Sequence, residues 1–211
     1  MRFSSEKKFN NFNFLNQIIT CDEKWIPYNN FVCSNQWLSS GESARPTPKS
    51  DFRQQKVMLS IFWNSAGVVH FELIPNGETI KAVNYCEQLN RVQQNLIRKH
   101  LVLINRKGVI FLQDNARPHS ANLTRNKLEE LKWEVLEHPP YSPDIAPSDY
   151  HLFRSMEHFL RGRRFQNRLD VHNAVDEFIS SKSPEFFARG IDLLPIRWQA
   201  VVDSNGEYMI D

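Results

Sequence analysis

The stretch Val-Ile-Phe-Leu-Gln-Asp-Asn, residues 109–115, runs from four apolar residues into an acid. Its apolar, partly β-branched start predicts a buried strand over 109–112. Residues 17–21 form a second run of this kind, which leads into Asp22 and Glu23. Two buried strands that each deliver an acid predict a sheet with carboxylates gathered at the carboxyl ends of its strands.

Around these two strands, the hydrophobic pattern alternates between the period of strands and that of helices. Residues 56–63 and 68–74 flank Ser65-Ala66-Gly67 and predict a β-hairpin. The other expected elements are helices over 81–100 and 121–131, a short strand over 134–136, a helix from about Ser148, a helix through 171–178, and a last helix through 187–201 that Pro195 starts or kinks. This pattern predicts an α/β fold with a mixed sheet flanked by helices.

A long excursion interrupts the pattern over about residues 29–55. Its Ser, Pro, Asn and Gln content has neither a helix nor a strand period. Such loops inside a compact domain are uncommon and often functional. We expect an inserted loop in a single domain over residues 1–211, because a chain of this length suits one sizeable core.

Composition narrows the class of protein. The 26 basic and 24 acidic residues leave a net charge of +2, so any contact with DNA must come from local patches. Cys21, Cys33 and Cys86 are sparse and lack metal-ligand spacing, which predicts free thiols in a reduced, intracellular protein. No apolar run has the length of a signal peptide or a membrane span, so we expect no membrane contact.

A third acid, Asp149, falls in the first turn of the helix expected from Ser148, where the helix dipole favours a carboxylate. We expect Asp22, Asp114 and Asp149 to converge at one edge of the sheet. Three carboxylates without a His or Cys cluster favour Mg²⁺ or Mn²⁺ over zinc. Two such ions about 3.5–4 Å apart promote the cleavage of phosphodiesters.

Two other acids are expected outside this site. Glu23 follows Asp22 and therefore points to the opposite face of the strand, where a structural salt bridge is its simplest role. Asp144 lies in a proline-rich turn, where an Asp side chain commonly bonds its own backbone.

Three motifs carry a family resemblance. They are Thr-Cys-Asp-Glu-Lys-Trp at 20–25, Asp-Asn-Ala-Arg-Pro-His at 114–119, and His-Pro-Pro-Tyr-Ser-Pro-Asp at 138–144 followed by Ala-Pro-Ser-Asp-Tyr at 146–150. They resemble the mariner (Tc1/mariner) transposases over nearly the whole chain, and the 34 residues between Asp114 and Asp149 match that family's spacing. The resemblance implies an RNase H-like fold of the retroviral integrase superfamily, Asp22, Asp114 and Asp149 as catalytic metal ligands, and cut-and-paste transposition of DNA. The family also carries an N-terminal helix-turn-helix DNA-binding half, which we expect this chain to lack.

Basic residues provide two candidate DNA contacts. Arg117 and His119 follow Asp114 closely enough to reach a phosphate or the outer sphere of bound metals, whereas the alternative is a helix N-terminus held by side-chain hydrogen bonds. A second cluster either neutralises DNA phosphates or forms a solvated charged face. Its members are Arg154, Arg161, Arg163, Arg164 and Arg168. Trp37, in the long loop, is a candidate for stacking on an unpaired base.

The leading hypothesis is the catalytic core of a mariner-type DNA transposase that uses Mg²⁺ or Mn²⁺, with two ions, for cleavage and strand transfer in the nucleus. Its expected partners are double-stranded DNA, as transposon ends and as target, and a second copy of the chain. The alternative is a catalytically inert or domesticated relic that binds DNA or a partner protein without cutting. A third hypothesis, an enzyme acting on RNA–DNA hybrids, ranks last because no hybrid-reading feature is visible.

Overall fold

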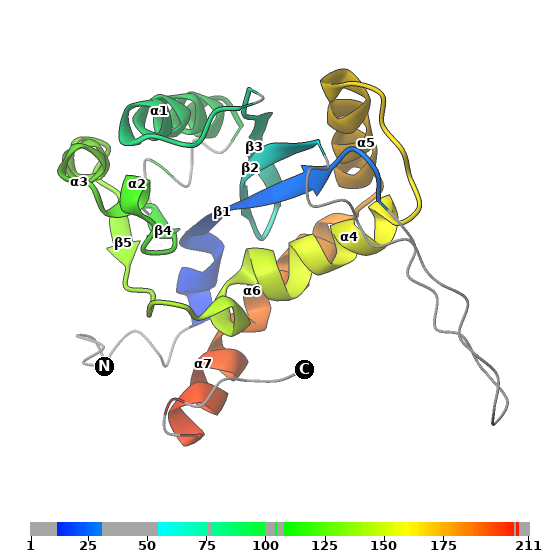
Figure 1. Ribbon diagram of the computed structural model, residues 1–211. Coiled ribbons are helices and arrows are strands. Elements are labelled where there is room, and N and C mark those ends of the chain that lie inside the picture. Colours follow the sequence, from blue (N-terminus) through cyan, green and yellow to red (C-terminus); the bar gives the residue numbers. More distant parts are fainter. Residues whose placement is uncertain are drawn as a thin grey trace, which may run out of the picture.

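The computed structural model describes residues 12–30, 55–75, 77–99, 104, 108–204 and 206. Most of the excursion expected over about 29–55, with Trp37 and Cys33, lies outside the described residues. Five strands form one sheet in the order β3-β2-β1-β4-β5 (Figure 1). They are β1 (Ile18–Pro27), β2 (Lys56–Asn64), β3 (Gly67–Leu73), β4 (Ile110–Leu112) and β5 (Glu134–Leu136). The sheet is mixed, since β1 pairs antiparallel with β2 and parallel with β4.

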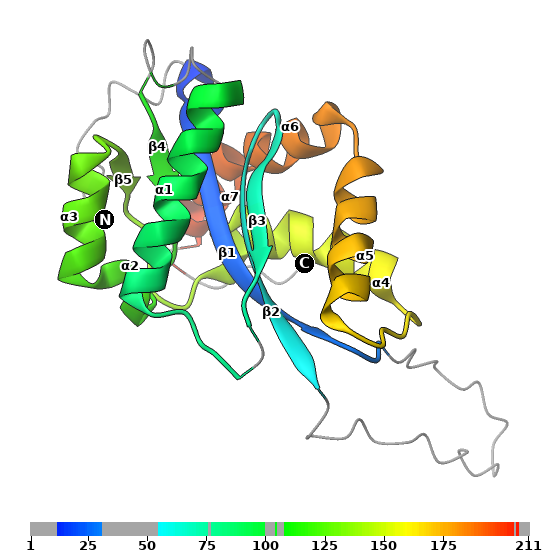
Figure 2. The same ribbon diagram turned by 90° about the horizontal axis from the view of Figure 1, so that it is seen from above.

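Helices and helical turns cover both faces of this sheet (Figures 1 and 2). They are η1 (Phe12–Gln17), α1 (Ala82–Lys99), α2 (Arg117–Ser120), α3 (Asn122–Glu130), η3 (Pro143–Ile145), η4 (Ser148–Phe153), α4 (Arg154–Leu160), α5 (Arg168–Ser180), α6 (Pro184–Asp192) and α7 (Leu194–Asp203). The turn η4 is π-helical and runs directly into α4. No helix in the described part of the chain is both long and apolar enough to cross a bilayer.

Alternation along the central strands divides the core into two. In β1, Ile18 and Ile26 join the cluster beneath α4, α5 and α6, while Ile19 and Cys21 join the cluster beneath α1. Figure 1 shows α1 on one side of the sheet and α4 and α6 on the other. Neighbouring residues of β1 therefore reach different layers of the molecule, which later separates Asp22 from Glu23.

Most expected elements are confirmed, including the hairpin of β2 and β3, the helix α1 and the short strand β5. The first strand differs from the prediction, because β1 does not end at Asp22 but continues to Pro27. Its second half pairs only with β2, which supplies the hydrogen bonds that carry the strand through its polar residues.

The C-terminal helix expected through 187–201 is two helices, α6 and α7. The chain breaks at Leu193, and Pro195 stands in the first turn of α7. Proline suits the first turn of a helix and disfavours the interior, so Pro195 starts a new helix here.

Candidate active site

The sheet register brings Asp22 and Asp114 to the same edge. In the parallel pair of β1 and β4, Thr20 lies opposite Leu112. Asp22 and Asp114 each follow by two residues, beyond the last ladder position shared by these strands. The chain turns away after β4, whereas β1 continues, so a cleft opens where the two strands separate.

The third acid, Asp149, is carried to this edge by η4, and two buried hydrogen bonds hold this turn in place. The indole nitrogen of Trp63 donates to the Ser148 hydroxyl over 3.1 Å, and the Tyr150 hydroxyl donates to the Gly190 carbonyl over 2.7 Å. Both bonds are buried. They hold the two residues that flank Asp149, so the position of its carboxylate is set by the core.

The three acids line one cleft of about 580 Å³. Arg117, His138 and Tyr141 lie along the same cleft. The sequence prediction that the three aspartates converge agrees with this arrangement.

Asp22 and Asp149 crowd each other within the cleft. Burial, and then the negative charge of Asp149, raises the pKa of Asp22 well above its ordinary value. Burial also raises the pKa of Asp149, although Lys24 and a hydrogen bond with Asp22 act in the opposite direction. Two like charges in contact disfavour full ionisation, and the raised pKa of Asp149 shows that Lys24 compensates this pair only in part.

Lys24 is the cation that acts on Asp149, and its ammonium group also has two other contacts. It contacts Glu157 Oε1 at 2.6 Å and lies 5.2 Å from the centre of the Phe153 ring. Lys24 lies two residues after Asp22 in β1, so both side chains are on the same face of the sheet. This spacing of two could have indicated Lys24 from the sequence.

The opposite face of β1 carries a different arrangement. His119 is buried with 1% of its side chain exposed, and its Nδ1 bonds Asp114 Oδ1. Its Nε2 lies 3.4 Å from Glu23 Oε1. Glu23 therefore is a salt-bridge partner on the α1 side of the sheet, as expected.

Burial alone would lower the pKa of His119, but its bonds with Asp114 and Glu23 raise it to about 10. The pKa of Asp114 is lowered, because the hydrogen bonds from His119 and from the Ala116 backbone outweigh partial burial. His119 thus supplies an internal cation to two carboxylates. His119 contacts Asp114 on the side away from the cleft. Because its side chain is buried, it cannot bind a DNA phosphate directly.

A buried network anchors this imidazole. The ring of Tyr85 packs on it with 4.3 Å between ring centres, and the Tyr85 hydroxyl donates to Gln113 Oε1 over 2.8 Å. Gln113 Nε2 in turn donates to the His119 carbonyl over 3.3 Å. These contacts tie α1 and the end of β4 to the same histidine.

Asp114 keeps one oxygen for the cleft. Both of its bonds, from His119 and from the Ala116 N–H, end on Oδ1, and 49% of its side chain is exposed. Within the described residues, no three Asp, Glu, His or Cys side chains lie close enough together to hold a metal ion as they stand. The donor set consists of carboxylate oxygens with a crowded pair, which fits a hard divalent cation and not zinc.

The candidate DNA-contacting arginines do not all reach this cleft. Arg117 is exposed along it. In the second cluster, Arg154 begins α4 directly after the turn that carries Asp149, whereas the other four arginines lie from the end of α4 to the start of α5. Arg154, Arg161 and Arg164 are exposed.

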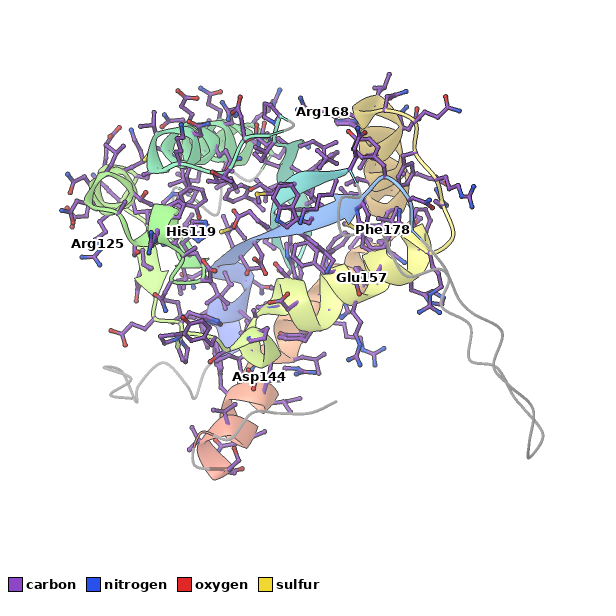
Figure 3. All side chains as sticks on the ribbon, viewed as in Figure 1. His119, Arg125, Asp144, Glu157, Arg168 and Phe178 are labelled. Carbon is purple, nitrogen blue, oxygen red and sulfur yellow. The ribbon has the colours of Figure 1, made fainter. Side chains whose placement is uncertain are left out.

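Arg163 and Arg168 have structural partners, and Arg154 is not without a partner either. Arg163 pairs with Glu177 at 2.6 Å and lies 4.0 Å from the centre of the Phe159 ring. Arg168, labelled in Figure 3, donates to the Leu73 carbonyl. The cluster is therefore partly a packing feature at the junction of α4, α5 and β3.

Asp144 also has a structural place. It is buried, and its backbone carbonyl accepts from Arg197 Nη1 over 2.8 Å, which joins η3 to α7. Figure 3 shows Asp144 near the base of the molecule. It does not line the cleft of the three aspartates.

Comparisons with known proteins agree with this geometry. Residues 27–106 match the family described as transposase (partial DDE domain). The chain is 49% identical over 195 residues to the human histone-lysine N-methyltransferase SETMAR, covering 92% of this chain and 28% of that protein. It is 42% identical over 197 residues to the mariner Mos1 transposase of Drosophila mauritiana, covering 93% of this chain and 57% of that protein. The chain thus spans less than two thirds of the length of either relative.

The fold of this chain also matches that of a mariner transposase. The crystal structure of the catalytic domain of Mos1 mariner transposase matches with a TM-score of 0.80 and 40% identity, covering 96% of this chain and 89% of that domain. The match includes the mixed sheet and its flanking helices, which are the RNase H-like integrase fold. The chain therefore belongs to the mariner family of transposases and corresponds to their catalytic domain.

Proposed function

We propose that this chain is the catalytic core of a mariner-type DNA transposase, which cleaves DNA phosphodiesters and joins DNA strands with divalent metal ions. The observation that carries the proposal is the convergence of Asp22, Asp114 and Asp149 on one open cleft. Structures of the related Mos1 transposase are paired-end complexes with Mn and with Mg, which supports both the metal class and the DNA substrate.

The three aspartates are the proposed metal ligands. Asp22 and Asp149 place two carboxyl groups next to each other, where a cation would relieve their repulsion. Asp114 would bind the metal through Oδ2, because His119 bonds its Oδ1. When bound there, Mg²⁺ or Mn²⁺, as two ions, would supply positive charge to the attacking and leaving oxygens of a phosphodiester.

The chain's own residues divide the remaining tasks. His119 holds Asp114 in one orientation through Oδ1, with Glu23 behind it. Outer partners of this kind fix the direction of a ligand and sustain its charge. Arg117, exposed along the cleft, is placed to bind a phosphate of the DNA. Of the arginines in the second cluster, Arg161 and Arg164 are the better candidates for DNA contact, because Arg163 and Arg168 bind other parts of the chain. Arg154 also has an interaction within the protein.

The proposed activity also indicates the substrate, the oligomeric state and the place of action. We expect double-stranded DNA, as transposon ends and target, to be the substrate, a homodimer to be the working form, and the nucleus to be the place of action. The cleft and both core clusters share one sheet, which supports a single RNase H-like domain over residues 1–211.

The test is plasmid nicking by the purified chain at low salt with Mg²⁺ or Mn²⁺, with DNA binding measured in parallel. Asp114→Ala should abolish nicking and leave binding largely intact. The matched control is Asp176→Asn, which removes an exposed acid on α5 away from the cleft.

Either result is informative. Metal-dependent nicking that disappears in Asp114→Ala and persists in Asp176→Asn supports the proposal. If the wild-type chain binds DNA but cuts neither plasmid nor mariner-end substrates with either metal, the inert-relic alternative replaces it.

A further inference from the structure

Tyr141 combines two features that folding does not explain. It is 98% exposed, far more than any other large apolar side chain in the described residues, of which Leu169 at 65% comes next. Its backbone is left-handed, with φ of 54°. A bulky residue in this region is strained, so the position costs stability and buries nothing in return.

The other non-glycine residue with positive φ within the described ranges has an ordinary explanation. Lys132, with φ of 57°, follows α3, where the Trp133 N–H donates to the Leu128 carbonyl and closes the helix end. Left-handed residues are common at such ends. Tyr141 ends no helix, since it lies between β5 and η3.

The backbone around Tyr141 is held on both sides. Pro139, Pro140 and Pro143 restrict the linker, and the Ser142 hydroxyl donates to the Pro140 carbonyl over 3.2 Å. Upstream, Asn115 Nδ2 donates to the His138 carbonyl, which joins the linker to the loop that carries Asp114. The ring is therefore presented from a fixed support beside the three acids.

We propose that Tyr141 is a stacking site for an unpaired nucleobase next to the phosphodiester that is cut. This inference rests on the proposed function. Arg117 and Tyr141 both line the cleft. Arg117 would bind the phosphate of a nucleotide, and the Tyr141 ring would stack on its base. Bases inside a duplex are already stacked on their neighbours, so an exposed ring selects a base that is unpaired. Because the support is already ordered, stacking requires little further loss of backbone entropy.

The test compares two DNA duplexes in EDTA, so that cleavage plays no part. One is fully paired, and the other carries a single unpaired 2-aminopurine, whose fluorescence reports stacking. The wild-type chain should quench the unpaired probe, and Tyr141→Phe should do the same. Tyr141→Ala should lose the quenching and bind the unpaired duplex roughly tenfold more weakly, with unchanged affinity for the paired one.

Leu169→Ala is the matched control, because it removes another exposed side chain on α5, outside the cleft. Equal affinities of wild type and Tyr141→Ala for the unpaired duplex would overturn the inference, and so would equal losses on both duplexes. A change in sedimentation of Tyr141→Ala without a change in DNA binding would instead assign the ring to contact with a second copy and also overturn it.

The two proposals fail separately. If the wild-type chain nicks DNA with Mg²⁺ and Tyr141→Ala shows no selective loss, only the stacking site is wrong. If the selective loss appears but no metal supports cutting, the stacking site stands and the nuclease function fails.

Discussion

On the η4 side of β1, Asp22 meets Asp149, whereas on the α1 side Glu23 meets His119, which also bonds Asp114. Burial raises the pKa of both aspartates in the first grouping, and the charge of Asp149 adds to the rise for Asp22. The second raises the pKa of His119 to about 10 and lowers that of Asp114. Asp22 and Glu23, neighbours on one strand, thus meet different partners on the two faces of the sheet because side chains alternate along the strand.

The difference is the presence of an internal cation. On the α1 side, buried His119 provides positive charge to both Glu23 and Asp114, so these carboxylates are paired without a ligand. The η4 side has room for further positive charge, because the pKa values of Asp22 and Asp149 stay raised although Lys24 acts on Asp149. Asp114 belongs to both groupings, since Oδ1 faces His119 and its other oxygen has no bond to the described residues.

The largest expected effect is on cleavage by Asp149→Asn. Removing one charge from the η4 grouping should slow metal-dependent nicking by about 10³-fold or more, because groups that act as a unit lose most of their effect together. DNA binding should change little. Single-turnover nicking rates and a parallel binding titration measure the two quantities, and equal losses in both would count against a metal-ligand role.

The next effect concerns stability on the α1 side. His119→Ala leaves Glu23 and Asp114 without their shared cation and should lower the free energy of unfolding by about 3 kcal/mol. Urea unfolding without metal measures this loss. The double variant Glu23→Gln with His119→Ala should lose less than the two single losses summed, because the charge of Glu23 is then no longer left unpaired. A loss within about 0.5 kcal/mol for His119→Ala, typical of surface changes, would show that the network contributes no stability.

The response to pH and metal should separate the two sides further. Folding raises the pKa of Asp22 and Asp149, so the folded state binds more protons than the unfolded one. Stability from this pair is therefore greatest at acidic pH and falls as the pH rises above about 4, the ordinary value for Asp. Mg²⁺ at 100 times its Kd should restore about 2.7 kcal/mol at neutral pH.

Thermal unfolding at several pH values, with and without Mg²⁺, measures this response. In Asp149→Asn both the fall with pH and the gain from Mg²⁺ should shrink. Wild-type stability that is indifferent to Mg²⁺ would mean that the crowded pair is not a metal site.

Much of this arrangement could be predicted from local sequence. The run at 109–115 predicts both β4 and the position of Asp114, because a short apolar strand and the acid after it are local features. The turn that carries Asp149 was also visible, since the prolines before it end one element and start another.

The parts that were missed depend on long-range contacts. The polar residues at 22–24 hide the second half of β1, whose pairing with β2 cannot be inferred from either segment alone. His119 was a candidate for a phosphate because it lies five residues after Asp114, yet its burial depends on the Tyr85 ring from α1. Arg163 and Arg168 likewise joined a basic cluster by sequence, while their partners come from α5 and β3.

The smallest expected effect concerns the strained Tyr141 at the rim of the cleft. Asparagine tolerates the left-handed region better than tyrosine, so Tyr141→Asn should raise the free energy of unfolding by about 0.5–1 kcal/mol. Lys132→Asn, at the other positive φ, should give a similar gain. Only Tyr141→Asn should lose selectivity for a duplex with an unpaired base, because only that position lines the cleft. Urea unfolding and the 2-aminopurine titration test both claims. A gain in stability without a loss of selectivity would leave the strain at Tyr141 without a function, whereas both changes together would show that the rim of the cleft gives up stability to hold a DNA contact.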